Sequence, residues 1–151
     1  MDVDFINENF PADEVPAVML EAVKFDALKG IDVQHAAIMR RLTGDATIEE
    51  RDTWQSKELA ARALLDGSAT DAQVEMLAIE AQYIGSSPQE LATVIVAKSD
   101  LFKKLTGLAA GVRGKSRAAI KAAIDFDAVA GAVEAARVDA TAAIALLQQT
   151  P

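Results

Sequence analysis

The stretch from Ser87 to Ile124 constrains the fold most, because it opens with a helix start signal and continues as one stripe of mainly apolar residues. Ser87 can accept hydrogen bonds from the first free backbone amides, Pro88 suits the first helical position, and Glu90 completes a capping box. The residues that recur at steps of three and four are Leu91, Val94, Ile95, Lys98, Leu101, Phe102, Leu105, Leu108, Ala109 and Val112. This spacing predicts a long central helix over about 88–124, whose apolar face needs other elements to cover it.

Three glycines interrupt this pattern at Gly107, Gly111 and Gly114. Each costs about 1 kcal/mol relative to alanine inside a helix. They favour a break or kink over residues 107–115, with a close backbone contact as the alternative.

The rest of the chain carries further helix signals and no convincing strand alternation. Capping boxes are predicted at Thr47 with Glu50 and at Thr70 with Gln73. A lone glycine follows several of the amphipathic stretches, as is usual where a helix ends. The predicted helices are 13–29 ended by Gly30, 32–42 ended by Gly44, 48–65 ended by Gly67, 71–83 ended by Gly85, and a last helix from Asp125 or Asp127 to about 147. We predict an all-α, single-domain helical bundle of five or six helices.

Within this bundle the pattern also predicts which faces are buried. On the helix 48–65, the apolar stripe of Trp54, Leu59, Ala61, Leu64 and Leu65 is predicted to face inward. Its charged residues Glu50, Arg51, Lys57, Glu58 and Arg62 are predicted to form a solvated face. On the helix 71–83, the inward residues are predicted to be Val74, Leu77, Ala78 and Ala81.

Three parts of the chain are expected to differ in their role. Residues 1–12 form an arm, in which Phe5, Ile6 and Phe10 stand among acidic and amide side chains, either disordered or docked on a partner or a neighbouring subunit. Residues 13–124 form the bundle, and residues 125–151 form an alanine-rich helix packing on the bundle or on another subunit. The seam of that helix is Phe126, Val129, Val133, Ala136, Ala140, Ala143 and Leu147, mostly small side chains that allow close helix pairing.

Composition excludes several classes of chemistry. The 151 residues include no cysteine and one histidine, His35, so thiolate metal sites and thiol catalysis are excluded and imidazole chemistry is restricted. The segment Gly111 to Ser116 ends like a phosphate-binding loop, but Ala109 stands where the earlier glycine is required. We therefore predict a non-enzymatic protein with no cofactor and no metal. No segment has the composition of a membrane span, so no membrane partner is expected.

Charge is distributed unevenly along the chain. Its formal net charge is −8, yet residues 98–121 carry seven basic residues against Asp100, which gives 7 − 1 = +6. This basic region either complements the acidic segment Met1 to Lys29, in the same subunit or the next, or contacts nucleic acid, which the missing aromatic residues disfavour. The candidate partner-binding residues are Phe5, Phe10, Lys103, Lys104, Arg113, Lys115, Arg117 and Lys121.

One segment has a family resemblance. It is carried by Arg51-Asp-Thr-Trp54-Gln-Ser-Lys57-Glu58-Leu-Ala60, by Tyr83-Ile-Gly85, by Glu90-Leu-Ala92 with Ala97-Lys98, and by Gly107 through Gly111-Val-Arg113. From Glu50 to about Ala123, roughly half of the chain, the sequence resembles the helical carboxy-terminal region of some tailed-bacteriophage tail and tail-fibre assembly proteins. The resemblance implies a phage or prophage product that acts by contact with other tail or structural proteins, either as an assembly chaperone or as a component of the particle. The small-residue seam and the split charge predict a homo-oligomer, and we expect it in the host cytoplasm during assembly or in the virion.

The sequence departs from that family before Glu50, where two predicted helices replace the expected glycine- and aromatic-rich fibre-like region. The alanine-rich helix after Asp125 is also additional. These departures leave open a virion structural component, such as a decoration, connector or fibre-attachment protein, which would be present in the particle. Nucleic-acid binding through residues 98–121 is the remaining alternative.

Overall fold

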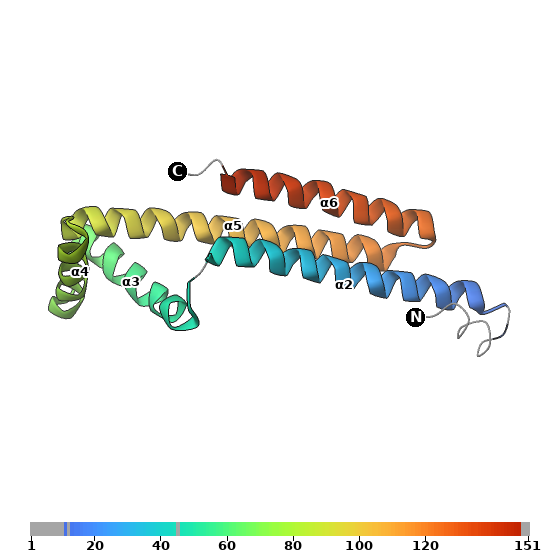
Figure 1. Ribbon diagram of the computed structural model, residues 1–151, viewed down its shortest axis with the longest axis horizontal. Coiled ribbons are helices and arrows are strands. Elements are labelled where there is room, and N and C mark those ends of the chain that lie inside the picture. The colour runs from blue at the N-terminus through green and yellow to red at the C-terminus, as the bar shows by residue number, and fades with distance from the viewer. Residues whose placement is uncertain (1–10, 12, 45, 149–151) are drawn as a thin grey trace. The chain divides into compact units, whose positions relative to one another are not determined.

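The computed structural model describes residues 11, 13–44 and 46–148. Over these residues the regular secondary structure is α-helix, joined by short turns (Figure 1). Its helices are α2 (Val15–Thr43), α3 (Ile48–Asp66), α4 (Asp71–Ile84), α5 (Pro88–Ala122) and α6 (Phe126–Gln148). The prediction of an all-α bundle with a long central helix is confirmed, with α5 as that helix.

Local capping chemistry sets most of the helix boundaries. At Thr70 the capping box is reciprocal, because Gln73 N donates to Thr70 Oγ1 and Thr70 N donates to Gln73 Oε1. The start of α5 is built in the same way from Ser87 and Glu90. Asp125 caps α6 through Ala128 N, 2.7 Å away. These starts lie where the sequence predicts them, because each depends on residues that are neighbours in the chain.

The helix boundary predicted at Gly30 is wrong. Helix α2 runs without interruption from Val15 to Thr43, so the two helices predicted over 13–29 and 32–42 are one. The reason is packing on both sides of the glycine. Leu28 before it and Ile31 after it belong to one apolar cluster, and only a continuing helix places both there.

The break predicted over residues 107–115 is also absent, since α5 is a single α-helix of 35 residues. The alternative, a close backbone contact, does not hold either. A Cβ added at Gly107, Gly111 or Gly114 would meet no neighbouring atom within 4 Å, apart from the helix's own nearby backbone. Buried Leu105 and Ile120 on either side explain why the helix continues despite the low propensity of glycine.

The chain divides into two compact units, and α5 contributes to both. We call them the terminal unit, made of the described residues up to Leu42 and from Leu105 onward, and the middle unit, Thr43–Lys104. Helix α6 packs with α2 and the second part of α5 in the terminal unit.

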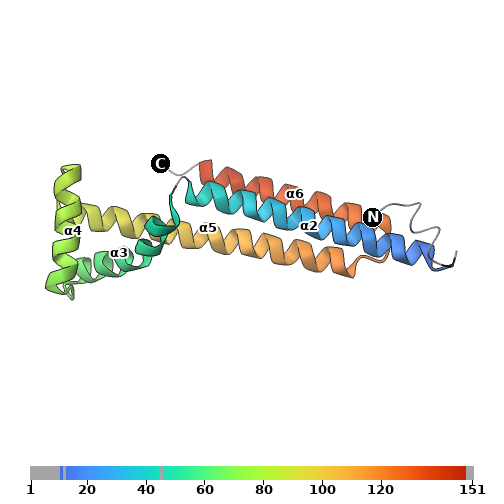
Figure 2. The same ribbon diagram turned by 60° about the horizontal axis from the view of Figure 1, so that its bottom comes forward.

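In the terminal unit, α2 and α6 lie along the second part of α5 (Figures 1 and 2). One cluster joins Ile31, Ile120 and Ala136, and a second joins Ile38, Ala109 and Ala140. Each cluster takes one residue from each of the three helices, so the predicted small-residue seam of α6 is used inside the chain. The amino-terminal end of α2 extends past the α5–α6 turn in both views (Figures 1 and 2).

The middle unit is formed by α3, α4 and the first part of α5. Its core is small: the buried residues are Ala60, Ala61, Leu77, Ala81, Leu91 and Ala92. Trp54 and Phe102, both half-buried, make an edge-to-face contact with ring centroids 5.4 Å apart. The inward stripe predicted for α3 is therefore only partly right, since Leu59 and Leu65 are exposed while Ala60 is buried.

The free space around the α5 glycines allows a test of the unbroken helix by substitution with alanine. We expect Gly107→Ala, Gly111→Ala and Gly114→Ala each to stabilise the protein by about 0.5–1 kcal/mol, because alanine fits the helical backbone and the space is free. Urea unfolding followed by circular dichroism measures the change.

Gly67→Ala is the matched control. Its added Cβ also meets open space, but the residue has φ +79° as the C-cap of α3, so alanine there is strained and should destabilise by about 1 kcal/mol. A loss of stability in the three α5 variants would contradict the unbroken helix.

Candidate partner-binding surfaces

The predicted basic region does not form one patch within one unit. Lys103 and Lys104 belong to the middle unit, whereas Arg113, Lys115, Arg117 and Lys121 belong to the terminal unit. All six basic residues lie on the single helix α5. Each group is therefore examined within its own unit.

Arg113 and Arg117 converge on one carboxylate of α2. Arg113 Nε lies 2.8 Å from Asp32 Oδ1, and Arg117 Nη1 lies 2.7 Å from Asp32 Oδ2. The two arginines are one helical turn apart, which places both guanidinium groups on the same face of α5. Their hydrogen bonds and charge, that of Arg113 foremost, lower the pKa of Asp32 below its ordinary value. These residues thus connect α2 to α5.

Lys115 makes a similar ion pair between α5 and α6, since its Nζ lies 2.6 Å from Asp139 Oδ2. The acidic partners of Arg113, Lys115 and Arg117 are therefore Asp32 and Asp139, and neither lies in the segment Met1 to Lys29 that the sequence favoured. Lys104 and Lys121 are exposed and form no ion pair with any residue of the described chain.

In the middle unit, Lys103 joins a network around Glu58 of α3. Glu58 is only 8% exposed, although the sequence placed it on a solvated face. Its Oε1 accepts from Lys103 Nζ at 2.5 Å and from Arg62 Nε at 2.8 Å, and Arg62 also pairs with Asp100. Hydrogen bonds from Lys103, Ser99 and Arg62 lower the pKa of Glu58 to about 2. The carboxylate is thus a charged contact between α3 and α5.

The phosphate-binding-like segment and His35 are not arranged as a binding or catalytic site in the described residues. The segment Gly111 to Ser116 lies inside α5, where its amides belong to the helix, and Ser116 Oγ donates to Val112 O at 2.8 Å. The void beside His35 holds only about 10 Å³. Over the residues that the structure describes, no three His, Asp or Glu side chains are grouped to hold a metal ion. No helix in this part of the chain has both the length and the apolar character needed to cross a membrane.

Large apolar side chains are more often exposed than buried in the described residues. The buried ones are Ile31, Ile38, Leu77, Leu91, Leu105, Ile120 and Val129, and the other nine residues of the apolar core are alanines. Sixteen large apolar side chains are exposed. Single exposed apolar residues are normal on a protein surface, so only a group of them on one face indicates a contact with a partner.

Two strongly exposed apolar side chains lie on one face of α4, and we call Ile79 and Tyr83 the α4 face. Their exposed fractions are 51% and 88%. Ile79 and Tyr83 are one turn apart, and each lies two residues, or about 200° around the helix, from buried Leu77 and Ala81. The sequence reasoning missed this surface because it followed the inward stripe, although the opposite face already carried apolar residues at helical spacing.

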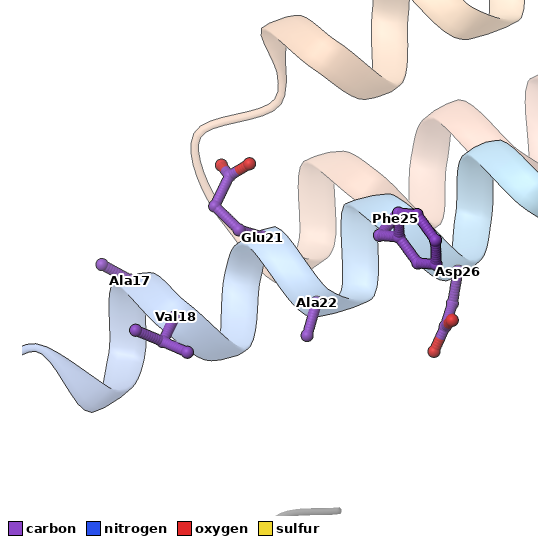
Figure 3. A pocket seen from close by; sticks show the side chains of 6 residues that line it. All are labelled: Ala17, Val18, Glu21, Ala22, Phe25 and Asp26. Atoms are coloured by element: carbon purple, nitrogen blue, oxygen red, sulfur yellow. The ribbon is translucent and has the colours of Figure 1, made fainter. Parts of the chain in front are cut away.

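A second apolar surface lies on the first turns of α2, where no residue before Ile31 is buried. A hollow of about 710 Å³ has its described lining on this helix: Ala17, Val18, Glu21, Ala22, Phe25 and Asp26 (Figure 3). Phe25 is 68% exposed and is the largest apolar side chain there. The candidates Phe5 and Phe10 lie outside the described residues.

No protein-family model matches the chain, and comparisons with curated proteins and with solved structures find no similar protein.

The Glu58 network generates a prediction about pH. Because its pKa falls from 4.5 to about 2 on folding, the carboxylate stabilises the protein above pH 4.5, and this contribution disappears as the pH falls through 2. We expect Glu58→Gln to destabilise the protein by about 1–3 kcal/mol at pH 7, the usual range for hydrogen bonds to charged groups. Urea unfolding at a series of pH values measures both effects.

Glu75→Gln is the control, since Glu75 is exposed on α4 and forms no ion pair with a described residue. The difference in stability between the wild type and Glu58→Gln should shrink between pH 5 and pH 2. A difference that stays constant over this interval would show that the charge of Glu58 contributes nothing.

Proposed function

We propose that this chain is a non-enzymatic interaction protein of a tailed phage or prophage, acting in tail or tail-fibre assembly. The observation that supports binding is the α4 face, where Ile79 and Tyr83 are each more than half exposed on a helix whose opposite side carries buried Leu77 and Ala81. Burying such side chains against a partner releases free energy of about 25 cal/mol per Å² of apolar surface. The resemblance between residues 50 and 123 supports the phage context.

Tyr83 is the residue best suited to anchor a contact. Tyrosine is enriched among the residues that dominate binding energy, because it combines a large apolar ring with a polar hydroxyl group. At 88% exposure it contributes little to the folded monomer, so its removal should change binding far more than stability. Its neighbour Ile79 extends the same face by one turn.

The basic residues support a structural role in the monomer rather than a nucleic-acid surface. Lys103, Arg113, Lys115 and Arg117 each make an ion pair with a carboxylate of the same chain. A phosphate group would have to compete with these carboxylates. The proposal therefore depends on the apolar surface.

The double variant Ile79→Ser/Tyr83→Ser tests the α4 face. We expect its affinity for a purified tail protein of the source phage to fall about thirtyfold, since interface anchors contribute about 2 kcal/mol or more. Val33→Ser is the matched control, because Val33 is also exposed but belongs to the terminal unit. Isothermal titration calorimetry measures the affinity, and equal affinities for the wild type and the double variant would reject the α4 face as the contact.

Mass spectrometry of purified particles distinguishes the two roles that the sequence leaves open. An assembly factor should be absent from mature particles while co-purifying with a tail protein from infected cells. A stoichiometric amount in the particle would instead identify a virion structural component. A strict monomer that binds no phage protein would contradict both.

A further inference from the structure

Two lysines at the start of α5 take no part in the ion pairs of the described chain. Lys98 and Lys104 are exposed, and neither forms an ion pair with a residue that the structure describes. They lie on opposite sides of an apolar stripe of the same helix, made of Val94, Ala97 and Leu101 at steps of three and four. Val94 is 47% exposed, Ala97 is exposed and Leu101 is half-buried. We call these five residues the α5 face, a surface that is both apolar and basic.

The α4 face is bordered by charge of the opposite sign. Helix α4 contains Asp71, Glu75 and Glu80 and no basic residue. Glu80 pairs with Lys57 at 2.8 Å, whereas Glu75 forms no ion pair within the described part of the chain. Glu75 is exposed and lies one turn before Ile79, so an unpaired carboxylate adjoins the apolar side chains of this face.

Helix α5 of the same chain lies on the other side of α4. Leu77 and Ala81 pack in one cluster with Leu91 of α5. These two α4 residues lie about 200° around the helix from Ile79 and Tyr83. A basic helix that covers the α4 face must therefore come from another molecule.

We propose that the α4 face of one chain binds the α5 face of a second copy, with the two helices antiparallel. Ile79 then lies opposite Leu101, Glu75 lies opposite Lys104, and Tyr83 packs on the first part of the apolar stripe. This inference rests on the proposed function in using the α4 face as a contact surface, and it names a second copy as an occupant of that face.

The order of residues along the two helices selects the antiparallel arrangement. On α4, acidic Glu75 precedes Ile79 and Tyr83 by about one and two turns. On α5 the order is reversed, because the apolar stripe precedes Lys104. Antiparallel helices therefore bring acid to base and apolar to apolar side chains at the same time. Parallel helices would instead place Glu75 against Val94.

Pairing of the α4 face with itself is disfavoured by charge. It would bring together two helices that carry only acidic residues, and it would leave Lys98 and Lys104 unpaired. Because the two proposed faces differ, the contact is heterologous and can continue from one copy to the next. A tail protein that binds the α4 face competes with the second copy for it.

Charge reversal at exposed residues tests this contact without altering the buried core. We expect the wild type to associate as its concentration rises, as measured by sedimentation velocity. Glu75→Lys and Lys104→Glu should each raise the dissociation constant by about tenfold or more, because each places like charges opposite one another.

Asp26→Lys and Lys121→Glu are the matched controls for net charge. Both residues are exposed, belong to the terminal unit and form no ion pair with a described residue. Each control changes the net charge as much as its counterpart does, so a general charge effect would appear in both. We expect their dissociation constants to stay close to that of the wild type, and circular dichroism checks that every variant is folded.

An equal mixture of Glu75→Lys and Lys104→Glu chains tests that two different faces meet. In this mixture the substituted α4 face of one variant meets the substituted α5 face of the other with opposite charges. The unsubstituted faces of the two variants meet as in the wild type. Association should therefore return in the mixture, although each variant alone associates poorly.

The inference is overturned if the wild type stays monomeric at millimolar concentration, if Lys104→Glu behaves like Lys121→Glu, or if the mixture associates no better than its components. Its failure is distinct from that of the proposed function, which depends on the affinity of the α4 face for a tail protein. A monomeric chain whose affinity for the tail protein falls with Ile79→Ser/Tyr83→Ser keeps the proposed function and loses only the contact between copies.

Discussion

The close approach of helices at alanine residues is the constraint on which the rest of this structure depends. Where Ala109, Ala136 and Ala140 face one another's helices, the backbones can come near, but each alanine buries little apolar surface. The same clusters also bury Ile31, Ile38 and Ile120, while many other large apolar side chains of the described residues stay exposed. Ion pairs such as that of Asp32 with Arg113 add polar contacts between the same helices.

Helix starts were predictable because they depend on residues three positions apart, as at Thr70 and Ser87. Helix ends were predictable only where glycine takes a left-handed conformation, as Gly67 and Gly85 do. Gly30 and the three glycines of α5 have no such backbone, and nothing in the local sequence separates the two cases. Packing decided them: partly buried Leu28 and buried Ile31 flank Gly30, buried residues lie on both sides of the α5 glycines, and their packing outweighs about 1 kcal/mol per glycine.

The burial of α3 was harder to predict for a different reason. Its leucines at Leu59 and Leu65 carry the stronger hydrophobic signal, yet Ala60 and Ala61 face the core because they allow α4 and α5 to approach. The same geometry encloses Glu58, whose partner Lys103 is 45 residues away. Such a long-range pairing leaves no local pattern. The sequence predicted that the basic residues form ion pairs, but it did not identify their partners. Asp32, Glu58 and Asp139 are partners because of which helices are neighbours.

The edge-to-face pair of Trp54 and Phe102 has a spectroscopic consequence. Trp54 is the only tryptophan of the chain and Tyr83 the only tyrosine, and both belong to the middle unit. Intrinsic fluorescence therefore follows one unit alone, whereas far-ultraviolet circular dichroism follows the helices of both. Coincident transitions by the two signals are expected only if the units unfold together. The distribution of aromatic residues thus makes the cooperativity between the two units measurable without any added label.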